Sequence, residues 1–305
     1  MTTEPKAMSL KEFQALIPDE PSAVAYFEQV RWGGHVACPF CGSLDILRVT
    51  SGKPMPLRCR SCREHFSVKT GTLMQSSKIG VKDWLLTMYF MTVAKKGVSS
   101  CQIARQLGIR QATAWFLCQR IREAWNQGRF ILDGEVEMDE TYIGGKEKNK
   151  HGDKKLRAGR GAVGKVPVVG LKQRKGKMYA VVAGTPSKRV LHEIIDERVC
   201  PSTTLYTDEH RGYVGANVRE HIAVKHSAGE YVKGRASTNG VESFWALLKR
   251  GYYGTYHKMS AHHLSHYVDE FATRQNAIGL TTETQLKDTL SGMVGKRLPY
   301  KDLIQ

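Results

Sequence analysis

Residues 38–62 read CPFCGSLDILRVTSGKPMPLRCRSC and contain two Cys-x-x-Cys pairs, Cys38 with Cys41 and Cys59 with Cys62, separated by seventeen residues. Two such pairs at this spacing are typical of a structural zinc site. Zinc prefers four tetrahedral ligands, and each pair can place two thiolates on one metal ion. Two disulfides, or four unrelated core thiols, are the alternatives. We expect a closed four-thiolate site that holds a small domain together and leaves no position open for a substrate.

The composition indicates a protein that binds a polyanion. The chain has 305 residues, enough for about two or three domains. Its 46 Lys and Arg residues outnumber 29 Asp and Glu, and the formal net charge is +17. Such an excess attracts nucleic acid, although a merely solvated basic surface is the alternative. There is no apolar run long enough for a membrane span, and Glu4 and Glu12 interrupt the region where a secretory signal would lie, so we predict neither.

The segments around the cysteines are predicted to be helical. Apolar residues at helical spacing indicate helices over residues 10–17 and 21–30, and a third helix over residues 83–95. Two more helices follow, one ending at Gly108 and one running from Gln111 to about Trp125. Helix, glycine-containing turn, helix is the order of a helix-turn-helix motif. An ordinary helical hairpin in a core is the alternative.

Two basic segments are candidate DNA contacts. In a helix-turn-helix motif the second helix lies in the major groove, so the first set of candidates is Arg110, Gln111, Thr113, Arg120 and Arg122. Residues 146–165 are rich in glycine and carry eight Lys or Arg against two acidic residues. We interpret this segment as a mobile loop along phosphates, although a solvated disordered loop is the alternative. Its candidate DNA contacts are Lys154, Lys155, Arg157 and Arg160.

From residue 130 the pattern changes to that of a sheet. Strands are predicted over residues 135–142, 166–171, 178–182 and 203–207, and helices over 187–199, 237–250 and 260–276. A meander of strands, followed by strands that alternate with helices, predicts an α/β domain with a mixed sheet.

Two aspartates lie near the ends of predicted strands, Asp139 in EMDET and Asp208 in LYTDE. Neighbouring strands that both end in Asp would bring two carboxylates to one rim of the sheet. Mg²⁺ prefers carboxylate ligands, and two such ions can promote cleavage of a phosphodiester. Taken alone, either aspartate is more often a cap or turn residue. The adjacent Glu140 and Glu209 could be the ligands instead, but strand alternation points them to the opposite face.

The segment STNGVESFWALLK (237–249) begins a helix that can complete this site. Asn239, Glu242 and Lys249 share one face of the helix, because residues three or four apart are neighbours. Either Asn239 or Glu242 could meet the metal ions, while Lys249 contacts a phosphate. We expect the buried face to consist of Phe244, Trp245 and Leu248. The chain has neither the HExxH motif of a zinc hydrolase nor a Walker A motif.

The chain resembles the bacterial insertion-sequence transposases that have an N-terminal zinc ribbon and an RNase H-like, DDE-type catalytic domain, the ISXO-like, Mutator-related family. The resemblance covers residues 9–303, and its motifs are CPFCG, CRSC, FSVKTGT, MDETYIGGK, TDEHRGY and TNGVESFWALLKRGYYGTYH. With it we divide the chain into N-terminal helices (1–31), a zinc ribbon (32–72), a helix-turn-helix region (78–128), an RNase H-like catalytic domain (130–280) and a C-terminal tail (281–305).

The resemblance implies the roles of the site residues. Asp139 and Asp208 match the first two metal ligands of the family. The third position varies among Asn, His and Glu before a following Lys, so we take Glu242 as the third ligand, Asn239 as the alternative and Lys249 as the following lysine. The separation between Asp208 and Glu242 suits an aspartate-aspartate-glutamate triad.

The implied activity is metal-dependent DNA strand transfer, with Mg²⁺ or Mn²⁺ as the catalytic ion and a structural Zn²⁺ in the ribbon. The expected partners are the element's ends and the target DNA, and cutting at two ends implies a homo-oligomer on DNA. We expect a cytoplasmic, nucleoid-associated protein. The alternatives are a catalytically inactive zinc-ribbon and helix-turn-helix regulator, and a nuclease that cleaves without joining.

Overall fold

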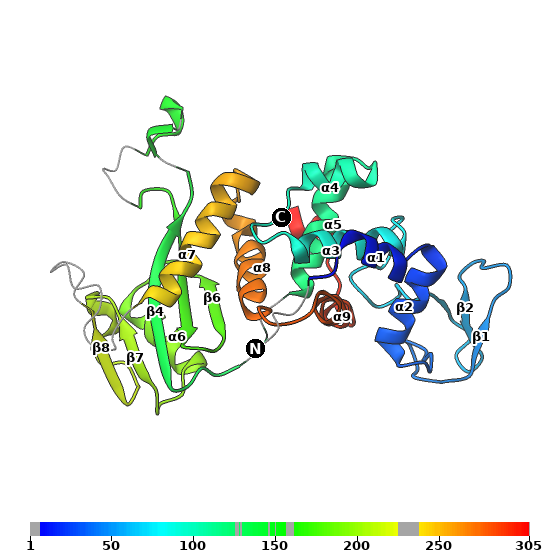
Figure 1. Cartoon of the computed structure of the whole chain (residues 1–305), viewed down its shortest axis with the longest axis horizontal. Helices are drawn as coiled ribbons and strands as arrows, with labels where there is room; N and C mark the ends of the chain where they lie inside the picture. Colours follow the sequence, from blue (N-terminus) through cyan, green and yellow to red (C-terminus); the bar gives the residue numbers. More distant parts are fainter. Residues whose placement is uncertain are drawn as a thin grey trace. The chain divides into compact units, whose positions relative to one another are not determined.

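The chain forms two compact units, the first of Met1–Trp125 with Gly279–Gln305 and the second of Asn126–Ile278 (Figure 1). The structure is a computed structural model and describes residues 7–125, 128, 130–145, 147–149, 151–156, 162–224 and 238–304. Among the helices of these residues, none is both long enough and apolar enough to cross a membrane.

The first unit begins with two helices, as the sequence predicts, and both start at a capping side chain. Helix α1 (Leu10–Leu16) starts at Ser9, which forms a reciprocal capping box with Glu12, and α2 (Glu20–Trp32) starts at Asp19. Helix α2 ends at Gly33, in the left-handed conformation that favours glycine. The cysteine segment follows as a three-stranded antiparallel ribbon, β1 (Ile46–Arg48), β2 (Leu57–Cys59) and β3 (His65–Phe66).

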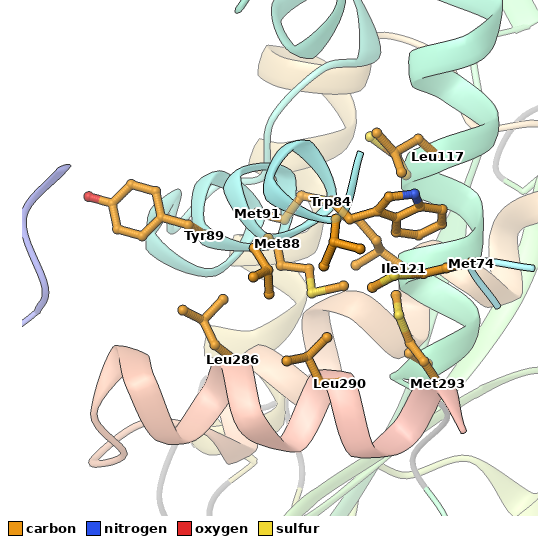
Figure 2. Packing of buried hydrophobic residues seen from close by; sticks show 14 of the residues in the cluster. Met74, Trp84, Met88, Tyr89, Met91, Leu117, Ile121, Leu286, Leu290 and Met293 are labelled. Carbon is orange, nitrogen blue, oxygen red and sulfur yellow. The ribbon is translucent and has the colours of Figure 1, made fainter. Parts of the chain in front are cut away.

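The helical part of the first unit packs around α3 (Val81–Val93). Helices α4 (Ser100–Leu107) and α5 (Gln111–Ala124) follow, separated by a short turn in which Gly108 has a φ of 63°. Trp84 and Met88 of α3 pack in one buried cluster with Leu117 and Ile121 of α5 (Figure 2). The two helices and the glycine turn agree with the predicted elements.

The segment predicted as a C-terminal tail belongs to this same core. It contains α9 (Thr282–Met293) and the short helix α10 (Tyr300–Ile304). Leu286, Leu290 and Met293 recur at helical spacing along α9 and point into the cluster around α3 and α5. Figure 2 shows this face of α9. The apolar spacing of α9 therefore returns the end of the chain to the first unit.

The second unit is built on a five-stranded mixed sheet with the order β6-β5-β4-β7-β8. Strands β4 (Glu135–Ile143), β5 (Val166–Gln173) and β6 (Met178–Val182) form the predicted antiparallel meander. Strand β7 (Thr204–Thr207) pairs parallel to β4, and β8 (Glu220–Ala223) pairs parallel to β7. The sheet is mixed, as predicted, although the short and partly exposed β8 has no strand signal in the sequence.

Helices cover both faces of this sheet. Helix α6 (Lys188–Arg198) packs Leu191 and Ile195 in one cluster with Val169 of β5. Helices α7 (Asn239–Gly251) and α8 (Leu264–Asn276) form another cluster with Val168, the preceding residue of the same strand. Because successive strand residues point to opposite faces, the two clusters lie on opposite sides of the sheet. The unit is therefore a three-layer α/β domain.

Candidate functional site

The four paired cysteines come together in the ribbon of the first unit. The Sγ atoms of Cys38 and Cys62 are 3.6 Å apart, as are those of Cys41 and Cys59, and all four lie within 4.8 Å of one another. Tetrahedral zinc with bonds of about 2.3 Å places its sulfur ligands about 3.8 Å apart. The thiols are free, so the disulfide alternative fails. The donor set supports the predicted structural zinc ion.

The second candidate centre is on the rim of the five-stranded sheet. Strands β4 and β7 run parallel with Glu137 opposite Tyr206, and this register brings Asp139 level with Asp208, just beyond the end of β7. Carboxylate oxygens of Asp139, Glu140 and Asp208 lie within 4.8 Å of one another. The two predicted aspartates are thus neighbours, as the placement of both near strand ends suggests.

Asp139 is held by a residue from another element. The indole Nε1 of Trp245 in α7 donates to Asp139 Oδ2 at 2.9 Å. Burial raises the pKa of Asp139 to about 6, while the hydrogen bonds from the Glu140 backbone and from Trp245 act in the opposite direction. The charges of Asp208 and Glu242 also raise this pKa. Asp139 is therefore a carboxylate whose negative charge is poorly compensated by the chain alone.

Glu140 leaves β4 on the face opposite Asp139, as strand alternation predicts, and it interacts with Tyr213 of the cluster on that face. Its carboxylate nevertheless lies within 4.8 Å of those of Asp139 and Asp208, at the rim of the sheet where β7 ends at Thr207. The corresponding residue Glu209 is exposed and is not in the cluster.

The start of α7 forms one wall of a pocket of about 450 Å³ over these carboxylates. Glu242 and Lys249 line the pocket and are exposed in it, as their shared helix face predicts. Glu242 Oε1 accepts a hydrogen bond of 2.8 Å from Thr238, and its carboxylate lies outside the tight cluster of three. Asn239, the first residue of α7, is exposed and does not line the pocket. The pocket is lined by Asp139, Glu140, Thr141, Asp208, Thr238, Glu242, Trp245, Ala246 and Lys249.

Glu137 fixes α7 on the sheet and was missed by the sequence analysis. Its Oε2 accepts hydrogen bonds from the backbone N–H groups of Gly240 (2.7 Å) and Val241 (3.1 Å) in the first turn of α7. A carboxylate at this end of a helix also interacts favourably with the helix dipole. The strand pattern of the sequence places Glu137 on β4 but does not reveal its contact with α7, because Gly240 is more than a hundred positions away.

The candidate DNA contacts of the first unit fall into two groups. Arg110, Gln111 and Thr113 are exposed at the start of α5. Arg120 is only 7% exposed, and its Nη1 donates to the carbonyl oxygen of Leu73 at 3.0 Å. Its guanidinium also stacks over Trp84 in the core. The prediction that Arg120 contacts DNA is therefore corrected, and Arg122 is buried likewise.

The second basic segment is described only in part. Lys154 ends a short 3₁₀ helix, Gly152–Lys154, and Lys155 follows it with an exposed side chain. Arg157 and Arg160 lie outside the described residues.

Comparison with known proteins matches both units to transposase families. Residues 131–276 match the ISXO2-like transposase domain, and residues 18–65 match the transposase zinc-ribbon domain. The chain is 28% identical over 286 residues to the uncharacterized protein of transposable element ISH50 from Halobacterium salinarum, covering 89% of this chain and 96% of that one. An uncharacterized transposase-like protein of Haemophilus influenzae is 35% identical over 78 residues, covering 25% of this chain and 63% of the relative.

Among solved structures, the Mos1 strand transfer complex is 13% identical to this chain, with a TM-score of 0.20. The match covers 70% of this chain and 79% of the Mos1 chain. The two family matches coincide with the zinc ribbon and with the domain that holds the carboxylate cluster. The match to the ISH50 protein covers most of the chain. The chain therefore belongs to the IS1595 family of transposases and has an N-terminal zinc ribbon.

Proposed function

We propose that this transposase is a DDE-type DNA strand transferase, which binds the terminal repeats of its element, cleaves there and joins the ends to target DNA. The observation that carries the proposal is the meeting of Asp139 and Asp208 on neighbouring parallel strands, at the rim of a pocket in the transposase-family domain. RNase H-like chemistry needs carboxylates in such a place, because the ions that serve it bind to oxygen ligands.

The donor set fits a hard divalent cation such as Mg²⁺ or Mn²⁺. Oxygen atoms from three carboxylates lie within 4.8 Å of one another and face a pocket. When bound, such ions activate an attacking oxygen and stabilise the leaving oxygen of a phosphodiester. Asp139 and Asp208 hold the ions, and Glu242 supplies the third ligand from α7, with Asn239 as the alternative. Glu242 is favoured because it lines the pocket and Asn239 does not.

The chain's remaining residues position DNA. Lys249 is exposed in the pocket, and this exposure supports a contact with a phosphate of the scissile strand. In cleavage, water attacks phosphorus and the bond to the 3′-oxygen of the element breaks. In joining, that 3′-hydroxyl attacks a target phosphate and displaces the target's 3′-oxygen. Neither step requires a covalent bond to the protein.

Recognition of the element's ends is assigned to the first unit. Arg110, Gln111 and Thr113 are exposed at the start of α5, where a recognition helix meets base edges. Lys154, Lys155, Arg157 and Arg160 add affinity that is independent of sequence and falls with salt. Because two ends are cut together, the active form is a homo-oligomer on DNA, at the bacterial nucleoid in the cytoplasm.

A strand-transfer assay tests the proposal. A labelled duplex with the element's own ends is incubated with plasmid and Mg²⁺, and wild type is compared with Asp139→Asn and Asp208→Asn. Glu209→Gln is the matched control, because Glu209 adjoins Asp208 but lies outside the cluster. We expect joined product from wild type and the control only. Binding without cleavage by wild type would instead favour a DNA-binding regulator, and cleavage without joining would favour a nuclease.

A further inference from the structure

A buried tyrosine lies behind the carboxylate cluster. Tyr213 ends the short 3₁₀ helix Arg211–Tyr213, is fully buried, and packs in the same cluster as Leu191 of α6. Its hydroxyl has no hydrogen-bond partner among the described residues. It interacts with the carboxylate of Glu140. A hydroxyl buried in an apolar core is costly unless it is paired, so this placement points at Glu140.

Glu140 lacks a compensating positive charge within the part of the chain that the structure describes. Its side chain is 9% exposed and lies beside the carboxylates of Asp139 and Asp208. The nearest group that can become positive is His210, whose Nδ1 is 3.9 Å from Glu140 Oε1 and whose side chain is 49% exposed. No Lys or Arg forms an ion pair with Glu140 in the described residues. Three partly buried carboxylates at this separation repel one another unless a cation lies between them.

We infer that Glu140 is a further metal-holding carboxylate of this centre and that Tyr213 is its positioning residue. The inference rests on the proposed function, since it adds one oxygen ligand to the divalent-cation site of Asp139 and Asp208. The three carboxylates already lie within 4.8 Å of one another, whereas that of Glu242 lies outside this group. Glu140 therefore belongs to the group of carboxylates that the sheet supplies, to which α7 adds none. A purely structural Glu140 would need only a hydrogen-bonding side chain, whereas a metal-holding Glu140 also contributes its negative charge to the site.

The test measures Mn²⁺ binding rather than activity. The full-length chain with its zinc retained is titrated with Mn²⁺, and free Mn²⁺ is followed by electron paramagnetic resonance. Glu140→Gln keeps the shape and hydrogen-bonding capacity of the side chain but removes its charge, and we expect affinity to fall about tenfold or more. Glu209→Gln, the matched control on the neighbouring strand end, should leave the affinity unchanged.

Tyr213→Phe separates positioning from packing. This variant keeps the buried ring and removes only the hydroxyl, so we expect a loss of Mn²⁺ affinity of a few-fold with circular dichroism unchanged. If Glu140→Gln does not fold, Glu140→Asp keeps the charge and withdraws the carboxylate by one methylene, and it should also bind Mn²⁺ more weakly. Wild-type affinity in the folded Glu140 variant overturns the inference for Glu140, and wild-type affinity in Tyr213→Phe overturns its positioning role.

Asp139→Asn and Asp208→Asn distinguish a failure of the inference about Glu140 from a failure of the proposed metal centre. If both weaken Mn²⁺ binding and Glu140→Gln does not, the inference about Glu140 fails and the proposed metal centre stands. If none of the three changes binding, the proposed metal centre fails and the inference fails with it.

Discussion

Trp245 Nε1 donates a hydrogen bond of 2.9 Å to Oδ2 of Asp139, which ties the helix of the candidate site to its central strand. The indole ring reaches this position because residue 170 of β5 is a glycine. A Cβ atom at Gly170 would lie 2.6 Å from two ring carbons of Trp245, closer than real side chains pack. Three elements, β4, β5 and α7, thus meet at one carboxylate.

Trp245→Phe should lower strand transfer and change its pH dependence. The phenyl ring keeps most of the packing but cannot donate, and the lost hydrogen bond is one that lowers the pKa of Asp139. The pKa of Asp139 therefore rises in the variant, and we expect joining to fall about tenfold near neutral pH, with a smaller loss at higher pH. Joining rates measured across pH check this. Identical pH profiles for variant and wild type would show that the hydrogen bond does not act on Asp139.

Gly170→Ala should destabilise the second unit. The added methyl group meets the Trp245 ring and cannot be accommodated without moving the ring or β5. Overpacking of this kind costs about 1–3 kcal/mol in the free energy of unfolding. Gly184→Ala is the matched control, since a Cβ there meets nothing within 4 Å. Urea denaturation of both variants checks the prediction, which fails if their midpoints shift equally.

The free energy of unfolding of the magnesium-free protein should fall as Asp139 ionises. Its pKa is raised from 3.8 to about 6 in the folded chain, so the proton is held more tightly in the folded state than in the unfolded state. The stabilising contribution of this group is complete below the unfolded pKa and is lost as pH rises through about 6.

Asp139→Asn cannot ionise, so its stability relative to wild type should grow by about 1 kcal/mol between roughly pH 5 and 7.5. Urea denaturation without added Mg²⁺ measures this difference, with zinc retained in both proteins. Added Mg²⁺ should then stabilise wild type and not the variant. A difference that shrinks as pH rises would contradict the raised pKa.

Removing one ribbon thiolate should remove the zinc. Cys59 is fully buried and its Sγ is 3.6 Å from that of Cys41. We expect wild type to bind about one zinc ion per chain and Cys59→Ser to bind almost none at neutral pH, with loss of the ribbon fold. Cys101→Ser is the control, because Cys101 is exposed and outside the cluster. Metal analysis after gel filtration checks the stoichiometry, and full zinc retention by Cys59→Ser would rule out a four-thiolate site.

Leu290→Ala in α9 should destabilise the first unit by about 2–5 kcal/mol, the usual cost of truncating a fully buried leucine. The effect is notable because the residue lies in the segment that the sequence analysis treated as a tail. Leu280→Ala, at an exposed leucine just before α9, is the control. Thermal unfolding of both variants measures the difference, and equal midpoints would mean that α9 does not contribute to the core.

The local patterns of the sequence predict much of this structure because they depend on neighbours in the chain. The cysteine pairs, the helical spacing of α1 and the glycine turn at Gly108 each need only a few consecutive residues. The parallel pairing of β4 with β7 follows from the alternation of strands with helices, and it places Asp139 beside Asp208.

What the sequence did not predict depends on partners far along the chain. Arg120 carries the positive charge expected of a DNA contact, but it donates a hydrogen bond to the carbonyl oxygen of Leu73 and stacks on the Trp84 ring. The closeness of Glu140 to Asp139 and Asp208 depends on the rim of the sheet, and Glu137 acts on the first turn of a helix that begins more than a hundred positions later. No periodicity in the sequence records such distant relations.

The return of α9 to the first unit has a consequence for how copies of such an element decay. Leu286, Leu290 and Met293 are encoded late in the gene, yet they complete a core whose other helices are encoded early. A frameshift or stop codon anywhere in between yields an N-terminal fragment with an uncovered apolar surface, which cellular proteases and chaperones recognise. We therefore expect damaged copies not to leave behind a stable fragment that competes with the intact protein.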